Sequence, residues 1–192
     1  MDLLNGYRAS LAEFTERVAQ VSPQQWAEAT PCPDWDVRAL VNHLVGEDRW
    51  TVPMFAGARI ADVGDRFSGD LLGDDPAAAA ADAAREARAA VTAPGAMDRV
   101  VHLSFGDAPG SEYAYQLTAD HLIHAWDLAV AIGVDPTLDP AAVKVVADWF
   151  TAEEQAYRGA GIIGPRVDLP DGADAQDRLL AAFGRDPGWA PD

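Results

Sequence analysis

The stretch Tyr113–Gly133, which reads YAYQLTADHLIHAWDLAVAIG, constrains the fold of this 192-residue chain more than any other. It contains no proline and no glycine before Gly133, and its apolar residues Leu117, Leu128 and Ile132 recur at helical rather than strand spacing. We therefore predict one buried helix here, with Gly133 as its C-cap.

Polar residues share one face of this predicted helix. Asp120 and His124 are four residues apart, and Asp127 follows three residues later on the same face. Because unpaired polar groups are costly to bury, a hydrogen-bonded Asp120–His124 pair, with His121 and His124 as ordinary core or boundary histidines, accounts for this pattern. The alternative is a metal site, which requires a third ligand from elsewhere in the chain.

Other segments predict helices that would surround this one. They are Leu3–Val21, Val37 to about Phe55, the alanine-rich Ala77–Val91, Ala141 to about Tyr157, and the short Ala175–Phe183. Three long apolar-faced helices and an alanine-rich fourth, joined partly by long connections, predict an all-α protein built on a four-helix bundle. The tail, residues 158–192, keeps apolar residues that disordered tails usually lack. We expect it to pack on the bundle, so that residues 1–192 form a single domain.

The connecting segments carry weaker signals. Thr30–Asp36 predicts a rigid loop in which Asp36 caps the next helix, and Ser22–Pro23 predicts a short helical turn. Ala58–Pro76 predicts a long surface connection. Arg99–Phe105 predicts a short extended segment, in which His102 is better explained as an exposed strand position than as part of a site.

His43 is the natural third ligand. It lies beside the apolar stripe of the second predicted helix, where a single histidine is usually a boundary residue, and it would meet the Tyr113–Gly133 helix if the two helices pack together. His43, Asp120 and His124 would then supply two imidazoles and one carboxylate and leave positions open, as catalytic metal sites do. Such ligands suit zinc, which we expect first, or Ni or Fe(II).

Charge and cysteine content exclude some classes of function. Lys and Arg number 14 against 31 Asp and Glu, which gives a net charge of −17 and argues against nucleic acid or an anionic membrane as partner. Cys32 is the only cysteine, so no intramolecular disulfide forms. The sequence carries no signal-like segment and no apolar run of about 20 residues. We expect a cytoplasmic protein.

Three stretches carry a family resemblance: TPCPDWDVRALVNHLVGE (30–47), ADHLIHAWDLAVAIG (119–133) and GPRVDLPDGADAQDRLLAAFGRDPGW (164–189). They resemble the actinobacterial metal-binding proteins related to mycothiol-dependent maleylpyruvate isomerase, within the DinB/YfiT-like superfamily of helical-bundle metalloproteins. The resemblance implies metal ligands at His43, in the WxVxxLxxH segment, and at Asp120 and His124. The isomerase has a Glu where this chain has Asp120, and it carries a C-terminal domain for which we expect no counterpart here.

The function implied by this resemblance is that of a metal-dependent mycothiol-type transferase or isomerase that acts on a small electrophile. A non-catalytic metal-binding or stress-response bundle, and a metal-free bundle with only a polar core network, remain as alternatives. Asp127 would either orient a ligand imidazole or make a helix-packing hydrogen bond. Cys32, shortly before a helix N-terminus, is either a reactive thiol or, as we expect, a packing residue. Exposed aromatic residues leave a homodimer open.

Overall fold

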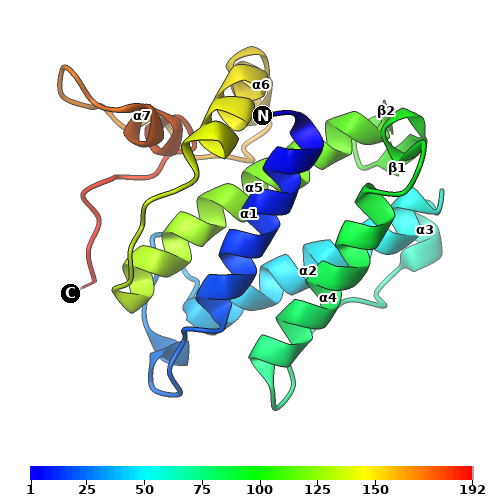
Figure 1. Ribbon diagram of the computed structural model, residues 1–192, viewed down its shortest axis with the longest axis horizontal. Helices are drawn as coiled ribbons and strands as arrows, with labels where there is room; N and C mark the ends of the chain where they lie inside the picture. The colour runs from blue at the N-terminus through cyan, green and yellow to red at the C-terminus, as the bar shows by residue number, and fades with distance from the viewer. Residues whose placement is uncertain (192) are drawn as a thin grey trace.

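The computed structural model describes residues 1–191, and four long helices form its centre (Figure 1). These helices are α1 (Leu3–Val18), α2 (Val37–Phe55), α4 (Pro76–Val91) and α5 (Gly110–Ile132). Helix α1 packs on α5 and α4, and α2 packs on the same two helices. The predicted all-α, four-helix bundle is therefore confirmed, with the alanine-rich segment as its α4 member.

The remaining elements lie around the bundle. They are the 3-10 turns η1 (Gln25–Ala27) and η2 (Ala96–Asp98), helices α3 (Ile60–Val63), α6 (Pro140–Gly159) and α7 (Ala175–Ala182), and strands β1 (Val100–Leu103) and β2 (Gly106–Pro109). The two strands pair antiparallel, with Val100 opposite Pro109 and Leu103 opposite Gly106. The second strand and α3 were not anticipated, and part of the predicted 58–76 surface connection is buried at Leu72.

The helix boundaries follow from capping side chains. Oδ1 of Asp36 accepts a hydrogen bond from the backbone N–H of Ala39 at 2.7 Å, and Asp75 and Asp139 cap α4 and α6 in the same way. Gly133 ends α5 with φ 73° and ψ 33°, the left-handed conformation that glycine adopts at low cost. The predicted caps at Asp36 and Gly133 are therefore observed.

Helix α5 lies in the middle of the molecule, and its core side is closed to solvent. Leu122, Ala125 and Leu128 are fully buried. His121 is buried on this side as well, where its Nδ1 lies 2.7 Å from the carbonyl oxygen of Leu117 and its Nε2 lies 3.2 Å from Oδ1 of Asp48. His121 therefore belongs to the core.

The tail packs back on the bundle, as predicted. The ring of Phe183 stacks on Phe150 of α6 with 4.0 Å between ring centroids, and Leu180 of α7 is fully buried. The backbone N–H of Val167 donates to the carbonyl oxygen of Ala181 at 3.1 Å. In Figure 1 α7 lies beside α6, and the chain then runs down from α7 to its C-terminal end.

Within residues 1–191, none of the helices combines the length and the apolar character that crossing a membrane would require.

Candidate metal centre

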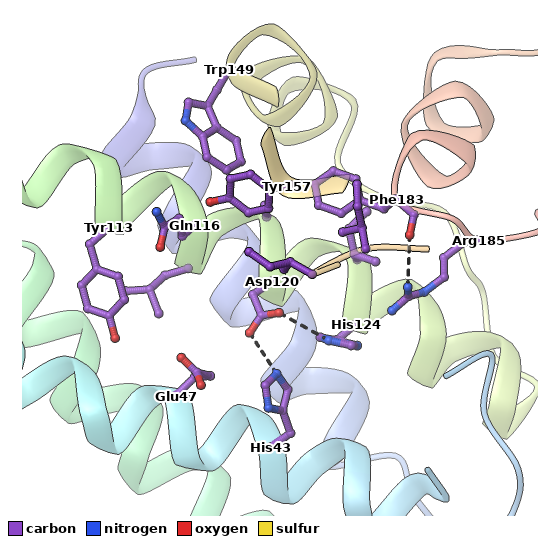
Figure 2. A pocket seen from close by; sticks show the side chains of 15 residues that line it. His43, Glu47, Tyr113, Gln116, Asp120, His124, Trp149, Tyr157, Phe183 and Arg185 are labelled. Atoms are coloured by element: carbon purple, nitrogen blue, oxygen red, sulfur yellow. Dashed lines mark hydrogen bonds and ion pairs between the residues drawn. The ribbon is translucent and has the colours of Figure 1, made fainter. Parts of the chain in front are cut away.

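Helices α2 and α5 bring together the three side chains that the sequence singled out. Nε2 of His43 lies 3.3 Å from Oδ2 of Asp120, and Nε2 of His124 lies 3.4 Å from Oδ1 of Asp120 (Figure 2). One candidate ligand atom from each residue lies within 4.8 Å of the others. The juxtaposition depends on α2 packing against α5, because His43 is the only one of the three that α5 does not carry.

The donor set fits a divalent metal ion. Atoms that sit about 2.0–2.1 Å from a tetrahedral zinc ion are about 3.3 Å apart, which is close to the N···O separations measured between His43, Asp120 and His124. The two ring nitrogens of His124 face two carboxylates, Asp120 at Nε2 and Asp127 at Nδ1, an arrangement that favours a positive charge on the ring or next to Nε2. A metal ion would supply that charge, and zinc, nickel and Fe(II) all accept this combination of nitrogen and oxygen ligands.

The ring of His124 is fixed from behind by Asp127. Nδ1 of His124 lies 2.8 Å from Oδ2 of Asp127, whose side chain is fully buried. A proton on Nδ1 donates to this carboxylate and leaves Nε2 to face the pocket. Burial works against a charge on His124, but the hydrogen bonds to Asp120 and Asp127 outweigh it and raise the pKa of His124 well above its ordinary value. A bound metal ion would take the place of a proton on Nε2.

Asp127 is itself held by a residue of the tail that the sequence did not reveal. Nε of Arg185 donates to Oδ1 of Asp127 at 2.9 Å, and Nη2 donates to Oδ2 at 2.8 Å. Burial raises the pKa of the Asp127 carboxyl, but His124 and Arg185 overcome that effect and hold it below its usual range. Residues 127 and 185 lie far apart in sequence, and a single arginine in a tail carries no periodic signal that would predict this ion pair.

Cys32 joins the same buried cluster. Its Sγ donates to Oδ2 of Asp127 at 3.2 Å and accepts from Nη2 of Arg185 at 3.2 Å. Cys32, His124 and Asp127 are also close enough to hold a metal ion. There the guanidinium of Arg185 already places a positive charge against the sulfur and the carboxylate, so His43, Asp120 and His124 form the better candidate site.

The His43, Asp120 and His124 cluster opens into a pocket of about 280 Å³. On the α2 and α5 side it is lined by the polar Glu47, Tyr113 and Gln116 and by apolar residues of α5, Leu117, Ala119 and Ile123. Burial, and then the neighbouring charge of Asp120, raise the pKa of Glu47. The opposite side is an apolar wall supplied by α6 and the tail, which consists of Trp149, Tyr157, Ile162, Ile163 and Phe183.

The histidine outside the bundle takes no part in this pocket. His102 lies on β1, where its Nδ1 is 2.6 Å from Oδ1 of Asp107 on β2. It lines a separate hollow together with Asp107, as an ordinary strand residue would. His102 is therefore a strand residue outside this pocket, as predicted, although its side chain is half-buried rather than exposed.

Comparisons with known proteins agree with this architecture. A family model described as the mycothiol maleylpyruvate isomerase N-terminal domain matches residues 7–129. An uncharacterized protein present in two strains of Mycobacterium tuberculosis is 32% identical over 194 residues, covering 96% of this chain and 98% of that protein. The crystal structure of the mycothiol-dependent maleylpyruvate isomerase and that of its histidine-to-alanine mutant align with TM-scores of 0.60 and 0.64. They are 16% and 15% identical, with 90% of this chain and 77% of theirs covered, and so support the fold alone.

Proposed function

Because this chain belongs to the family of the mycothiol maleylpyruvate isomerase N-terminal domain, we propose that it is a divalent-metal-dependent enzyme that presents a mycothiol-type thiol to a small electrophile. The observation that carries the proposal is the convergence of His43, Asp120 and His124 on one open pocket. Three protein ligands leave room for one exogenous ligand, as in catalytic zinc sites. Zinc is the metal we expect, with nickel or iron as alternatives.

The metal would supply one piece of chemistry: it would bind the thiol sulfur and favour the thiolate, which is the nucleophilic form. The chain itself does the rest. His43, Asp120 and His124 hold the ion, and Asp127 keeps Nε2 of His124 turned toward it. Arg185 keeps Asp127 ionised and in place. The apolar wall limits the water that reaches the reacting atoms.

The reaction class follows from thiol chemistry. The thiolate sulfur forms a bond to one carbon of an electrophilic double bond, and the π electrons move to the neighbouring carbon. If that carbon takes up the proton released by the thiol, the product is a thioether and the protein is a transferase. If the adduct rotates about the new single bond and expels the thiolate, the double bond returns in the trans form and the protein is an isomerase.

A matched pair of histidine variants tests the proposal. We expect His43→Ala to lose most of its bound metal, measured by elemental analysis after dialysis, and to lose mycothiol-dependent turnover of an electrophile. His102→Ala, on the hairpin, should keep both. Retention of stoichiometric metal by His43→Ala would overturn the ligand assignment. Metal binding without turnover of any electrophile would instead favour a non-catalytic metal-binding or stress-response bundle.

A further inference from the structure

One side of the pocket lies outside the segment that the family model matches. The family match ends at residue 129, whereas the apolar wall begins with Trp149 on α6 and continues to Phe183 in the tail. The metal-ligand candidates His43, Asp120 and His124 all lie inside the match. The family match therefore covers the side of the pocket that holds the candidate ligands. The substrate preference of the opposite side has to be inferred from the residues that line it.

That chemistry includes no cation free to receive an anion. Among residues 1–191, the lining of the pocket contains one Lys or Arg side chain, Arg185. Its Nε and Nη2 atoms donate to Asp127, Nη2 also donates to Cys32, and Nη1 donates to the carbonyl oxygen of Phe183 at 3.2 Å. Only 18% of the side chain is exposed. A substrate carboxylate would have to take Arg185 away from a buried aspartate, which leaves that aspartate unpaired.

The remaining charges in the pocket are negative. The carboxyl groups of Asp120 and Glu47 both line it. The whole chain adds a net charge of −17, which repels anions as they approach. A divalent ion at the cluster would offset one carboxylate of a substrate. A second carboxylate would find neutral donors such as the Tyr157 hydroxyl but no free cation, and burying its charge there is costly.

We infer that this pocket selects an uncharged electrophile with an apolar body and discriminates against dicarboxylates, the class to which maleylpyruvate belongs. The inference rests on the proposed thiol function. Two features produce the discrimination: the Glu47 carboxylate beside the ligand cluster, and the apolar wall where a dicarboxylate would need a cation. Ile163, partly buried in this wall, is the position where a single new charge would alter the preference most directly.

Dimethyl maleate and maleate form a matched pair of probes. Both contain the same cis double bond, and they differ only in the ester methyl groups that remove both charges. In each, addition of the thiolate, rotation about the carbon–carbon bond and loss of the thiolate produce the trans isomer without net gain or loss of atoms. Isomerisation therefore measures the same step for a neutral molecule and for a dianion.

The experiment uses the metal-loaded protein with mycothiol. Each isomerisation rate is divided by the rate without protein, which removes the difference in intrinsic reactivity. We expect the acceleration for dimethyl maleate to exceed that for maleate by at least about tenfold, equivalent to about 1.4 kcal/mol. Ile163→Lys should reduce this ratio, as should Glu47→Gln, whereas Val100→Lys, which adds the same charge at an exposed position of β1 outside the pocket, should leave it unchanged. Equal or greater acceleration of maleate, or a ratio that Ile163→Lys does not alter, would overturn the inference.

A binding measurement separates this inference from the proposed function. Dimethyl succinate and succinate have no double bond to attack, and their binding can be followed through the fluorescence of Trp149 in the wall, with Trp149→Phe to identify its signal. Tighter binding of the neutral diester supports the inference even if no thiol reaction takes place, in which case the proposed function alone fails. Tighter or equal binding of succinate, or binding of neither compound, overturns the inference.

Discussion

Nδ1 of His124 lies 2.8 Å from Oδ2 of Asp127, so this carboxylate determines which nitrogen of the imidazole faces the pocket. The pair is three residues apart on α5, and neither side chain depends on a loop for its position. Hydrogen bonds behind a metal-binding histidine fix its tautomer and raise its basicity. Asp127 should therefore influence metal binding without touching the metal.

Asp127→Asn should weaken metal binding by about 10- to 100-fold, because an amide is a poorer acceptor for the Nδ1–H of His124 and no longer carries the charge that pairs with Arg185. Competition with a chromophoric chelator measures the dissociation constant, and circular dichroism checks that the variant is folded. Asp148→Asn, on the exposed side of α6, provides a control in which a carboxylate is lost away from the site. Equal affinities for the two variants would mean that Asp127 serves only helix packing.

Arg185→Ala should lower the free energy of unfolding by about 3–5 kcal/mol, because it leaves the fully buried Asp127 without its cation. Arg185→Lys keeps the charge but loses the planar guanidinium with its several N–H donors. Its free energy of unfolding should therefore lie between those of the wild type and Arg185→Ala. Urea denaturation measures both changes. The control is Arg178→Ala on the surface of α7, for which we expect a change below about 0.5 kcal/mol. Similar stabilities for Arg185→Ala and Arg178→Ala would show that the tail does not depend on this ion pair.

The sequence predicted most of the bundle and the candidate ligand cluster, because both depend on local periodicity. Helical spacing of apolar residues identified α1, α2 and α5, and the i, i+4 relation placed Asp120 and His124 on one face. His43 required one further assumption, that α2 packs against α5, which the structure bears out.

What the sequence did not predict depends on contacts without a local pattern. Arg185 reaches Asp127 only after α6 and the tail have folded back, and no spacing rule links the two residues. The strand β2, GDAP, has too few apolar or β-branched residues to be predicted as a strand. Helix α5 starts at Gly110, three residues before the predicted Tyr113, and there its backbone lies close to Ala96 of η2, a contact between segments that no local pattern predicts.

Gly110→Ala should destabilise the protein by about 1–3 kcal/mol, because a Cβ at this first residue of α5 would overlap the carbonyl oxygen of Ala96. The matched control is Gly159→Ala at the end of α6, where a Cβ would meet no atom within 4 Å. There the better helix propensity of alanine should leave stability unchanged or raise it by up to about 1 kcal/mol. Thermal unfolding compares the two, and a Gly110→Ala variant as stable as Gly159→Ala would contradict the close approach.

Glu154→Gln should destabilise the protein at neutral pH by up to about 1 kcal/mol, and this difference should shrink in acid. Nε of Arg166 donates to Glu154 at 3.0 Å, and hydrogen bonds from Arg166 and Arg158 lower the pKa of Glu154. Because the pKa of Glu154 is lower in the folded protein, its ionised form stabilises the fold at pH values above the unfolded-state pKa of about 4.3. This stabilisation is lost as the pH falls through the pKa that Glu154 has in the folded protein. Urea unfolding of both proteins at neutral pH and below about pH 4 measures this, and a difference that grows in acid would contradict it.

The apolar wall and the ligand cluster lie on separate stretches of the chain, with the cluster complete at His124 and the wall starting at Trp149. A library of variants confined to residues 149–183 could therefore change which molecules enter the pocket while each candidate ligand, His43, Asp120 and His124, keeps its place on α2 or α5. Arg185 stays outside such a library, because it lines the pocket and also holds Asp127, which in turn contacts His124. Because the wall and the candidate ligands come from different stretches of the chain, the wall can be redesigned without changing the candidate ligands.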